Sequence, residues 1–184
     1  MNRFQHHCSR LLSFGSLLGV LAIACAAQAQ TCPVYPIALS GQMLSNVPVN
    51  TVVMDVQPGN FSWLSWAGDL SEPTLVTSLT APGDSTNYVN PDDLADHEID
   101  VDDWITAKPG SSNSIGVRDA LDNLAELDSI IVPVFDDVRD TGDTIAYHVS
   151  GFVQVRIVGH RQNKITLLFL GFTGCSGGDG GPGV

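Results

Sequence analysis

Acidic side chains are the residues of this sequence whose type and spacing could do chemistry, and they gather in two places. Seven lie between Asp92 and Asp103. Four more surround the segment DDVRDTGDT: Asp136, Asp137, Asp140 and Asp143. Calcium takes oxygen ligands of this kind, but the first group lacks the D-x-D-x-D-G spacing of an EF-hand, so a solvated surface and a calcium site both stay open. The second group is interpreted as an Asp/Gly turn, with a cation site as the alternative.

Other reactive residue types do not form a recognisable constellation. His97, His148 and His160 are widely spaced, and we interpret them as surface residues rather than as catalytic bases. The tail around Ser176 is similar to the G-D-S-G-G-P segment of a serine nucleophile, but its residues come in a different order. No H-E-x-x-H or P-loop motif occurs. We therefore expect no catalytic residues, no metal ligands and no cofactor.

The first 29 residues predict export. Arg3 and Arg10 flank the start of an apolar run over 11–26, and Ala27-Gln28-Ala29 supplies small residues at a cleavage point before Gln30. Loss of the two arginines shifts the formal net charge from −12 to −14. Such a charge repels nucleic acids and anionic lipids. We expect a secreted, periplasmic or cell-surface protein with no nucleic-acid partner and no membrane span after cleavage.

Two cysteines remain after that cleavage, Cys32 and Cys175. In an oxidising compartment they predict one disulfide that joins the first segment to the end of the last strand, with two free thiols as the alternative. A loop this long would be worth about 4–5 kcal/mol in the chain-entropy description of disulfides. Residues 175–184 are Gly-rich and are interpreted as a flexible tail.

One helix and several strands are predicted between these ends. Val117, Ala120, Leu121, Leu124 and Leu127 recur at helical spacing, which predicts an amphipathic helix over 114–127 with Asn113 or Ser114 as its cap. Apolar runs predict strands near 37–39, 51–56, 74–80, 130–136, 145–158 and 164–172. Pro133 and Gly151 should mark an edge or a bulge within the long strands. The aromatic stretch from Phe61 to Trp66 is expected to pack in the core rather than to bind carbohydrate.

These elements predict a mainly β fold. We expect a curled antiparallel sandwich or barrel-like sheet with one amphipathic helix across it, formed by a single domain over 30–174. The strand over 164–172 is apolar on both parities. It should therefore be covered on both faces or belong to a surface that buries against a partner.

Four segments in order along the chain resemble a known family. They are GNFSWLSW (59–66), VDDWITAKPGSSNS (101–114), IIVPVFDD (130–137) and YHVSGFVQVRIVGH (147–160), followed by a closing strand. Together they resemble the extracellular module of TadE/TadG-like proteins of tight-adherence (Flp) pilus assembly. The resemblance implies a role in assembly at the cell surface and carries over no enzyme activity and no catalytic residues.

Three functions follow as predictions. The first is a non-enzymatic exported module in pilus, cell-surface or matrix assembly or adhesion, with protein partners or a second copy of itself. The second is a calcium-dependent binding or adhesion domain that uses the acidic loops. The third is an unrecognised secreted hydrolase.

Overall fold

The computed structural model describes residues 33–56, 59–108, 113–142 and 144–174. The expected signal peptide, the Gly-rich tail and both Cys32 and Cys175 lie outside these residues. Within the described part, the strands are β1 (Ile37–Ser40), β2 (Thr51–Val56), β3 (Phe61–Leu64), β4 (Trp104–Lys108), β5 (Ile130–Asp140), β6 (Ile145–Arg161) and β7 (Lys164–Thr173). The helices are α1 (Gly41–Leu44), α2 (Glu72–Leu79) and α3 (Ile115–Ala125), with a 3-10 turn, η1, at Ser85–Asn87.

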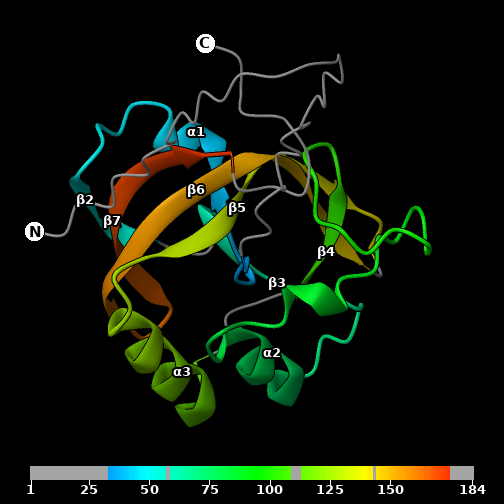
Figure 1. Ribbon diagram of the computed structural model, residues 1–184, viewed down its shortest axis with the longest axis horizontal. Helices are drawn as coiled ribbons and strands as arrows, with labels where there is room; N and C mark the ends of the chain where they lie inside the picture. The colour runs from blue at the N-terminus through cyan, green and yellow to red at the C-terminus, as the bar shows by residue number, and fades with distance from the viewer. Residues whose placement is uncertain (1–32, 57–58, 109–112, 143, 175–184) are drawn as a thin grey trace, which may run out of the picture.

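The strands form one curled sheet that closes on itself. Their order is β2-β7-β6-β4-β3-β1-β5, and β5 also pairs with β6, so β1, β3, β4, β6 and β5 make a closed five-stranded barrel. β7 and β2 extend the sheet beyond the barrel, and the long curved ribbons of β6 and β7 show this curl (Figure 1). The predicted mainly β, barrel-like architecture is confirmed.

The length of β6 explains how one strand serves both the barrel and its extension. One edge of β6 pairs with β5 from Ile145 to Val155. Its opposite edge pairs first with β4, up to His148, and then with β7 from Phe152 onward. The register shifts between these stretches. Val134 pairs with Gly151 and Phe135 pairs with Val149, so Ser150 is an extra residue in β6. The bulge predicted at Gly151 is therefore present, whereas Pro133 pairs in register with Phe152 and the shift follows Val134.

Two features of the sheet differ from the prediction. The pairing of β1 with β5 is parallel, with Leu39 opposite Val134, so the sheet is not wholly antiparallel. β3, β4 and α3 lie between these two strands in the chain, which leaves room for the return path that a parallel pair requires. β4 was not predicted as a strand at all, because the acidic run before Trp104 hides its start.

The predicted strand over 74–80 is wrong, since this segment lies in α2. Its Thr and Val content favours a strand, but Ser71 caps the helix by accepting a hydrogen bond from the Thr74 N–H, and Pro73 occupies the first turn. Leu75, Ser78 and Leu79 share the buried face at helical spacing. The described residues thus contain three helices, where the sequence predicted one.

The predicted amphipathic helix is α3, and its prediction is confirmed. The Ser114 hydroxyl accepts from the Val117 N–H at 3.2 Å, which fixes the start. Val117, Ala120, Leu121 and Leu124 are buried. α2 and α3 pack together at one end of the curled sheet, where α3 contacts β6 (Figure 1).

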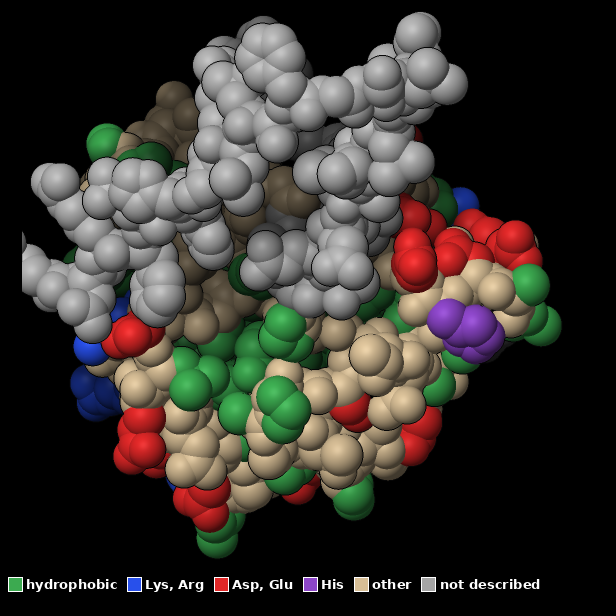
Figure 2. Space-filling view, viewed as in Figure 1, with side chains coloured by type: hydrophobic (Ala, Val, Ile, Leu, Met, Phe, Trp, Pro, Cys, Tyr) green, Lys and Arg blue, Asp and Glu red, His purple; other side chains and the backbone are tan. Residues whose placement is uncertain are grey.

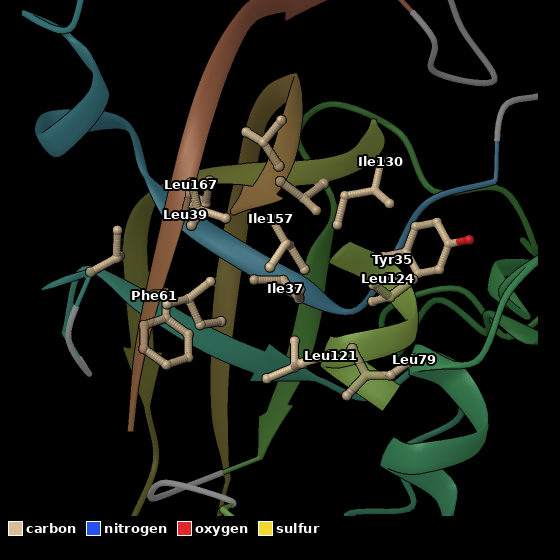
Figure 3. Packing of buried hydrophobic residues seen from close by; sticks show 14 of the residues in the cluster. Tyr35, Ile37, Leu39, Phe61, Leu79, Leu121, Leu124, Ile130, Ile157 and Leu167 are labelled. Carbon is tan, nitrogen blue, oxygen red and sulfur yellow. The ribbon is translucent and has the colours of Figure 1, made fainter. Parts of the chain in front are cut away.

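Two clusters of buried side chains make the core. The larger gathers one face of β1, β3, β5, β6 and β7 against the two helices, and Leu79, Leu121 and Leu124 reach towards Ile37 of β1 in it (Figure 3). The smaller lies around β4 and holds Leu64, Trp66, Tyr88, Ile105 and Phe152. Burying one such side chain fully contributes about 1.5–3 kcal/mol, so these clusters hold the sheet closed. Phe61, Trp63 and Trp66 are all buried, which confirms the core role predicted for the aromatic stretch.

Candidate functional site

The acidic segment, defined here as residues 88–103, is organised by a buried asparagine. Asn90 is 8% exposed, and its Nδ2 donates to Asp96 Oδ2 at 3.0 Å and to Asp103 Oδ1 at 2.8 Å. Its Oδ1 accepts from the Asp92 N–H at 2.9 Å. One amide side chain thus holds together three parts of the segment, including the residue that precedes β4.

Backbone donors satisfy the remaining oxygens of these two carboxylates. Asp103 Oδ2 accepts from the Asp100 N–H at 2.8 Å, and Asp96 Oδ1 accepts from the Glu98 N–H at 3.0 Å. The hydrogen bond from Glu98 lowers the pKa of Asp96. Burial instead raises the pKa of Asp103, and burial also raises the pKa of Asp100. The segment is therefore a folded polar network and not merely a solvated charge run.

Tyr88 anchors the segment in the smaller core cluster. Its ring packs edge-on against Trp66, and its carbonyl oxygen lies 2.8 Å from His97 Nδ1. Burial and then the negative charge of Asp103 raise the pKa of Tyr88 well above its ordinary value. No hydrogen bond of ordinary geometry joins the Tyr88 hydroxyl to Asp103, so the charge acts on it through space.

This arrangement bears on the calcium alternative. Across the described part of the chain, no group of three or more His, Cys, Asp and Glu residues is placed to hold a metal ion. The position between Asp96 and Asp103, where a cation would sit, is taken by the Asn90 amide. Through these two carboxylates the Asn90 amide fastens the chain ahead of β4.

A second polar cluster covers the outer face of β4, β5 and β6, beside the acidic segment. The Arg139 guanidinium lies 4.1 Å from the centre of the Trp104 ring and pairs with Asp92 at 3.4 Å. The ring of His148, directly opposite Trp104 in the sheet, lies 5.1 Å away. His148 Nδ1 lies 2.7 Å from Asp136 Oδ1. Acidic side chains gather on this side of the molecule (Figure 2).

The acidic hairpin turn behaves as a turn in the structure. Asp140 Oδ1 accepts from the Gly142 N–H at 2.8 Å, and Gly142 has a φ of +85°, which an L side chain rarely adopts. Asp137 accepts from the N–H of the next residue, and Asp143 lies outside the described residues. The turn interpretation of this group is supported, and its carboxylates point to different partners.

The three histidines are not brought together. His97 faces a backbone carbonyl, His148 faces Asp136, and His160 Nε2 lies 2.9 Å from Asp122 Oδ1 of α3. Each has a local structural partner on a different element. The surface position predicted for the histidines holds for His97, whereas the side chains of His148 and His160 are only 23% and 11% exposed. The sequence also did not indicate that His148 and Trp104 are neighbours, because β4 was not recognised.

An exposed apolar face lies on the extension of the barrel. We call it the apolar strip: Val49, Val52, Val158, Leu168 and Leu170. Val52 of β2 lies directly opposite Leu168 of β7, so both point to the same face, and Val49 lies against Gly171. Alternate residues of β7, among them Leu167 and Phe169, are buried on the other face. The strand that is apolar on both parities therefore buries one face and leaves the other partly open.

The strand edge beside the apolar strip is open among the described residues. β2 pairs with β7 on one side and stands first in the order of the sheet. The principal helix contacts are to β1, β5 and β6. β2 reads TVVMDV, with neither Lys nor Pro, the residues that commonly guard open edges. The short length of β2 and its register shift between Val53 and Val56 are the features that limit edge-to-edge aggregation here.

The predicted bond between Cys32 and Cys175 lies outside the described residues and stays a prediction. Thiol titration of the denatured, unreduced chain from residue 30 onward should find no free thiol, and two per chain would end the idea.

Comparisons with known proteins do not add a function. No family model, no curated protein and no solved structure matches this chain. No helix in the described ranges is long and apolar enough to cross a membrane. We therefore infer function from the geometry of the polar clusters and of the apolar strip.

Proposed function

We propose that this chain is an exported, non-enzymatic β-rich module for pilus, cell-surface or matrix assembly, and that it pairs with a second copy through β2. The observation that carries the proposal is the open β2 edge beside the apolar strip. An open edge offers a row of unpaired N–H and C=O groups to another strand. The resemblance to TadE/TadG-like modules and the predicted signal peptide supply the setting of this proposal.

A second copy can approach at the apolar strip, which carries no charged side chain. The molecule is acidic, with a formal net charge of −12, so two copies repel each other over most approaches. The apolar strip carries no charged side chain, and the charged residue beside it is Arg156, opposite Leu168. Two identical antiparallel edges can pair about a twofold axis and satisfy both sets of backbone groups. Contact at the strip thus joins two acidic molecules where their repulsion is weakest.

The affinity should be low. Val52 is 48% exposed, and covering a half-exposed side chain of this kind contributes about 1 kcal/mol. Three residues of the strip are about half-exposed and Leu168 and Leu170 are less so, so two copies give at most about 10 kcal/mol, against an association cost of about 4–15 kcal/mol. Where the association cost is about 4–6 kcal/mol, the remaining ~4–6 kcal/mol corresponds to a dissociation constant of about 0.04–1 mM in dilute solution, which a crowded or surface-bound array would strengthen.

Sedimentation equilibrium of the chain from residue 30 onward tests this proposal. The native chain should dimerise as its concentration rises through this range, and Val52→Lys should abolish the dimer. Val138→Lys is the matched control, because Val138 is 46% exposed but lies on β5, away from the strip. A chain that stays monomeric, or a dimer that Val52→Lys leaves intact, contradicts the proposal.

A further inference from the structure

His148 lies between carboxylates from two different elements. Its Nδ1 is 2.7 Å from Asp136 Oδ1 of β5, and its Nε2 is 3.7 Å from Asp102 Oδ1 of the acidic segment. The His148 side chain is 23% exposed, and its ring is held against Trp104. The imidazole therefore connects the barrel wall to the end of the acidic segment.

The neutral and the protonated imidazole interact differently with these two carboxylates. A neutral ring has one N–H, and the short contact to Asp136 places that proton on Nδ1. The Nε2 lone pair then faces the negative charge of Asp102, which is unfavourable. A protonated ring has an N–H on each nitrogen and attracts both carboxylates. The contact to Asp102 is thus the one that changes sign with the charge of His148.

Asp102 is at the point where the acidic segment joins β6. The Asp102 N–H donates to the Val149 carbonyl at 2.8 Å, and the Val149 N–H donates to the Asp103 carbonyl at 2.8 Å. Asp102 adopts a φ of 77°, which is rare for a residue other than glycine. A contact that strengthens or weakens at Asp102 acts directly on these two backbone hydrogen bonds.

Most of the charged groups around His148 are carboxylates. Asp136 lies on β5, where Asp137 is directly opposite His148 in the sheet. The acidic segment contributes Asp102, with Asp100 and Asp103 beside it. Arg139 is the one cation of this cluster, and its guanidinium is engaged by Asp92 and by the Trp104 ring. Negative charge therefore dominates the surroundings of the imidazole.

We propose that His148 is a pH-sensitive clasp that holds the acidic segment against β6, and holds it more tightly as the pH falls through the range in which histidine protonates. The clasp stands apart from the β2 edge and does not depend on self-association. At an acidic site during export or at a surface, the acidic segment would be held against β6. At higher pH this contact would weaken.

Amide hydrogen exchange at pH 5 and pH 7.5, corrected for intrinsic rates, tests the clasp. In the native chain, protection at Asp102 and Val149 should be at most about two- to fivefold greater at pH 5, as expected for one charge contact to a carboxylate whose side chain is 86% exposed. His148→Gln keeps a donor that cannot become charged, and it should remove this difference. Asp102→Asn keeps the histidine and should remove it too.

His160→Gln is the matched control, because His160 also pairs with a carboxylate, Asp122, but joins β6 to α3. It should leave the pH response at Asp102 and Val149 unchanged. Equal protection at both pH values in the native chain overturns the clasp. So does a pH response that survives both His148→Gln and Asp102→Asn, since Asp100 and Asp103 would then account for it.

Discussion

In the acidic segment and in the apolar strip, the residue types are a poor guide to which side chains still lack partners. The acidic segment carries residue types that are common in active sites. Its carboxylates nevertheless have partners within the molecule: Asn90, backbone N–H groups and His148. The apolar strip contains only Val and Leu, yet its side chains are partly exposed and the β2 edge has no strand neighbour among the described residues. The comparison teaches that an interaction site is marked by groups whose partners are missing, and not by how reactive those groups look.

The largest expected effect is a difference in unfolding free energy between substitutions on the two faces of β7. Leu167 is 2% exposed in the larger core cluster, so Leu167→Ala should lower the free energy of unfolding by about 2–5 kcal/mol. Leu168→Ala, one residue along on the apolar strip, should cost less than about 1 kcal/mol and should weaken dimerisation instead. Urea unfolding and sedimentation of both variants check this. Equal losses of stability would mean that the outer face is covered within one chain.

Loss of the Asn90 amide should have an intermediate effect. Asn90→Ala leaves the Asp96 and Asp103 oxygens facing each other without their shared donor, which should cost about 1–3 kcal/mol. Asn87→Ala is the control, because Asn87 is exposed and its contact to Asp84 is long, at 3.4 Å. Urea unfolding should show almost no change for the control. A neutral Asn90→Ala would show that the acidic segment is held by other contacts.

The smallest effect should be a change in pH dependence. Burial raises the pKa of Asp100 above the ordinary 3.8, so this group favours the folded chain while protonated and loses that contribution as the pH rises through its folded value. Asp96 has a lowered pKa and the opposite sign: its contribution is present above 3.8 and is lost as the pH falls through its folded value.

Unfolding midpoints at pH 4 and pH 7 measure this. Asp100→Asn should gain stability over the native chain at pH 7 and little at pH 4, whereas Asp96→Asn should lose stability at pH 7. A difference between Asp100→Asn and the native chain that is the same at both pH values would contradict the raised pKa.

The sequence predicts elements best where one local period dominates. α3 and the pair β5 and β6 follow such periods, and Ser114 and Gly151 mark the cap and a bulge correctly, whereas Pro133 pairs in register. The strand prediction over 74–80 fails because Thr and Val suit either structure, and the Ser71 cap with Pro73 decided the outcome. The parallel pairing of β1 with β5 could not be read from alternation, which carries no strand direction.

The candidate sites divide in the same way. The sequence predicted that the strand over 164–172 is either covered on both faces or buries against a partner. Among the described residues one face is buried and the other is partly exposed, so burial against a partner stays a prediction. The neighbours Trp104, Arg139 and His148 come from three strands, and only the register of β4 and β5 on β6 brings them together. The role of Asn90 has no local signal, because its partners lie six and thirteen residues away in a loop.

Residue-resolved hydrogen exchange of β2 at two protein concentrations tests the central claim most directly. The β2 amides that point away from β7 should exchange freely at low concentration and become protected above the dimerisation range, and Val52→Lys should keep them exposed. Protection that is the same at every concentration would assign the edge to another segment of the same chain. Free exchange at every concentration would show that the edge pairs with nothing, and either result would contradict self-pairing through β2.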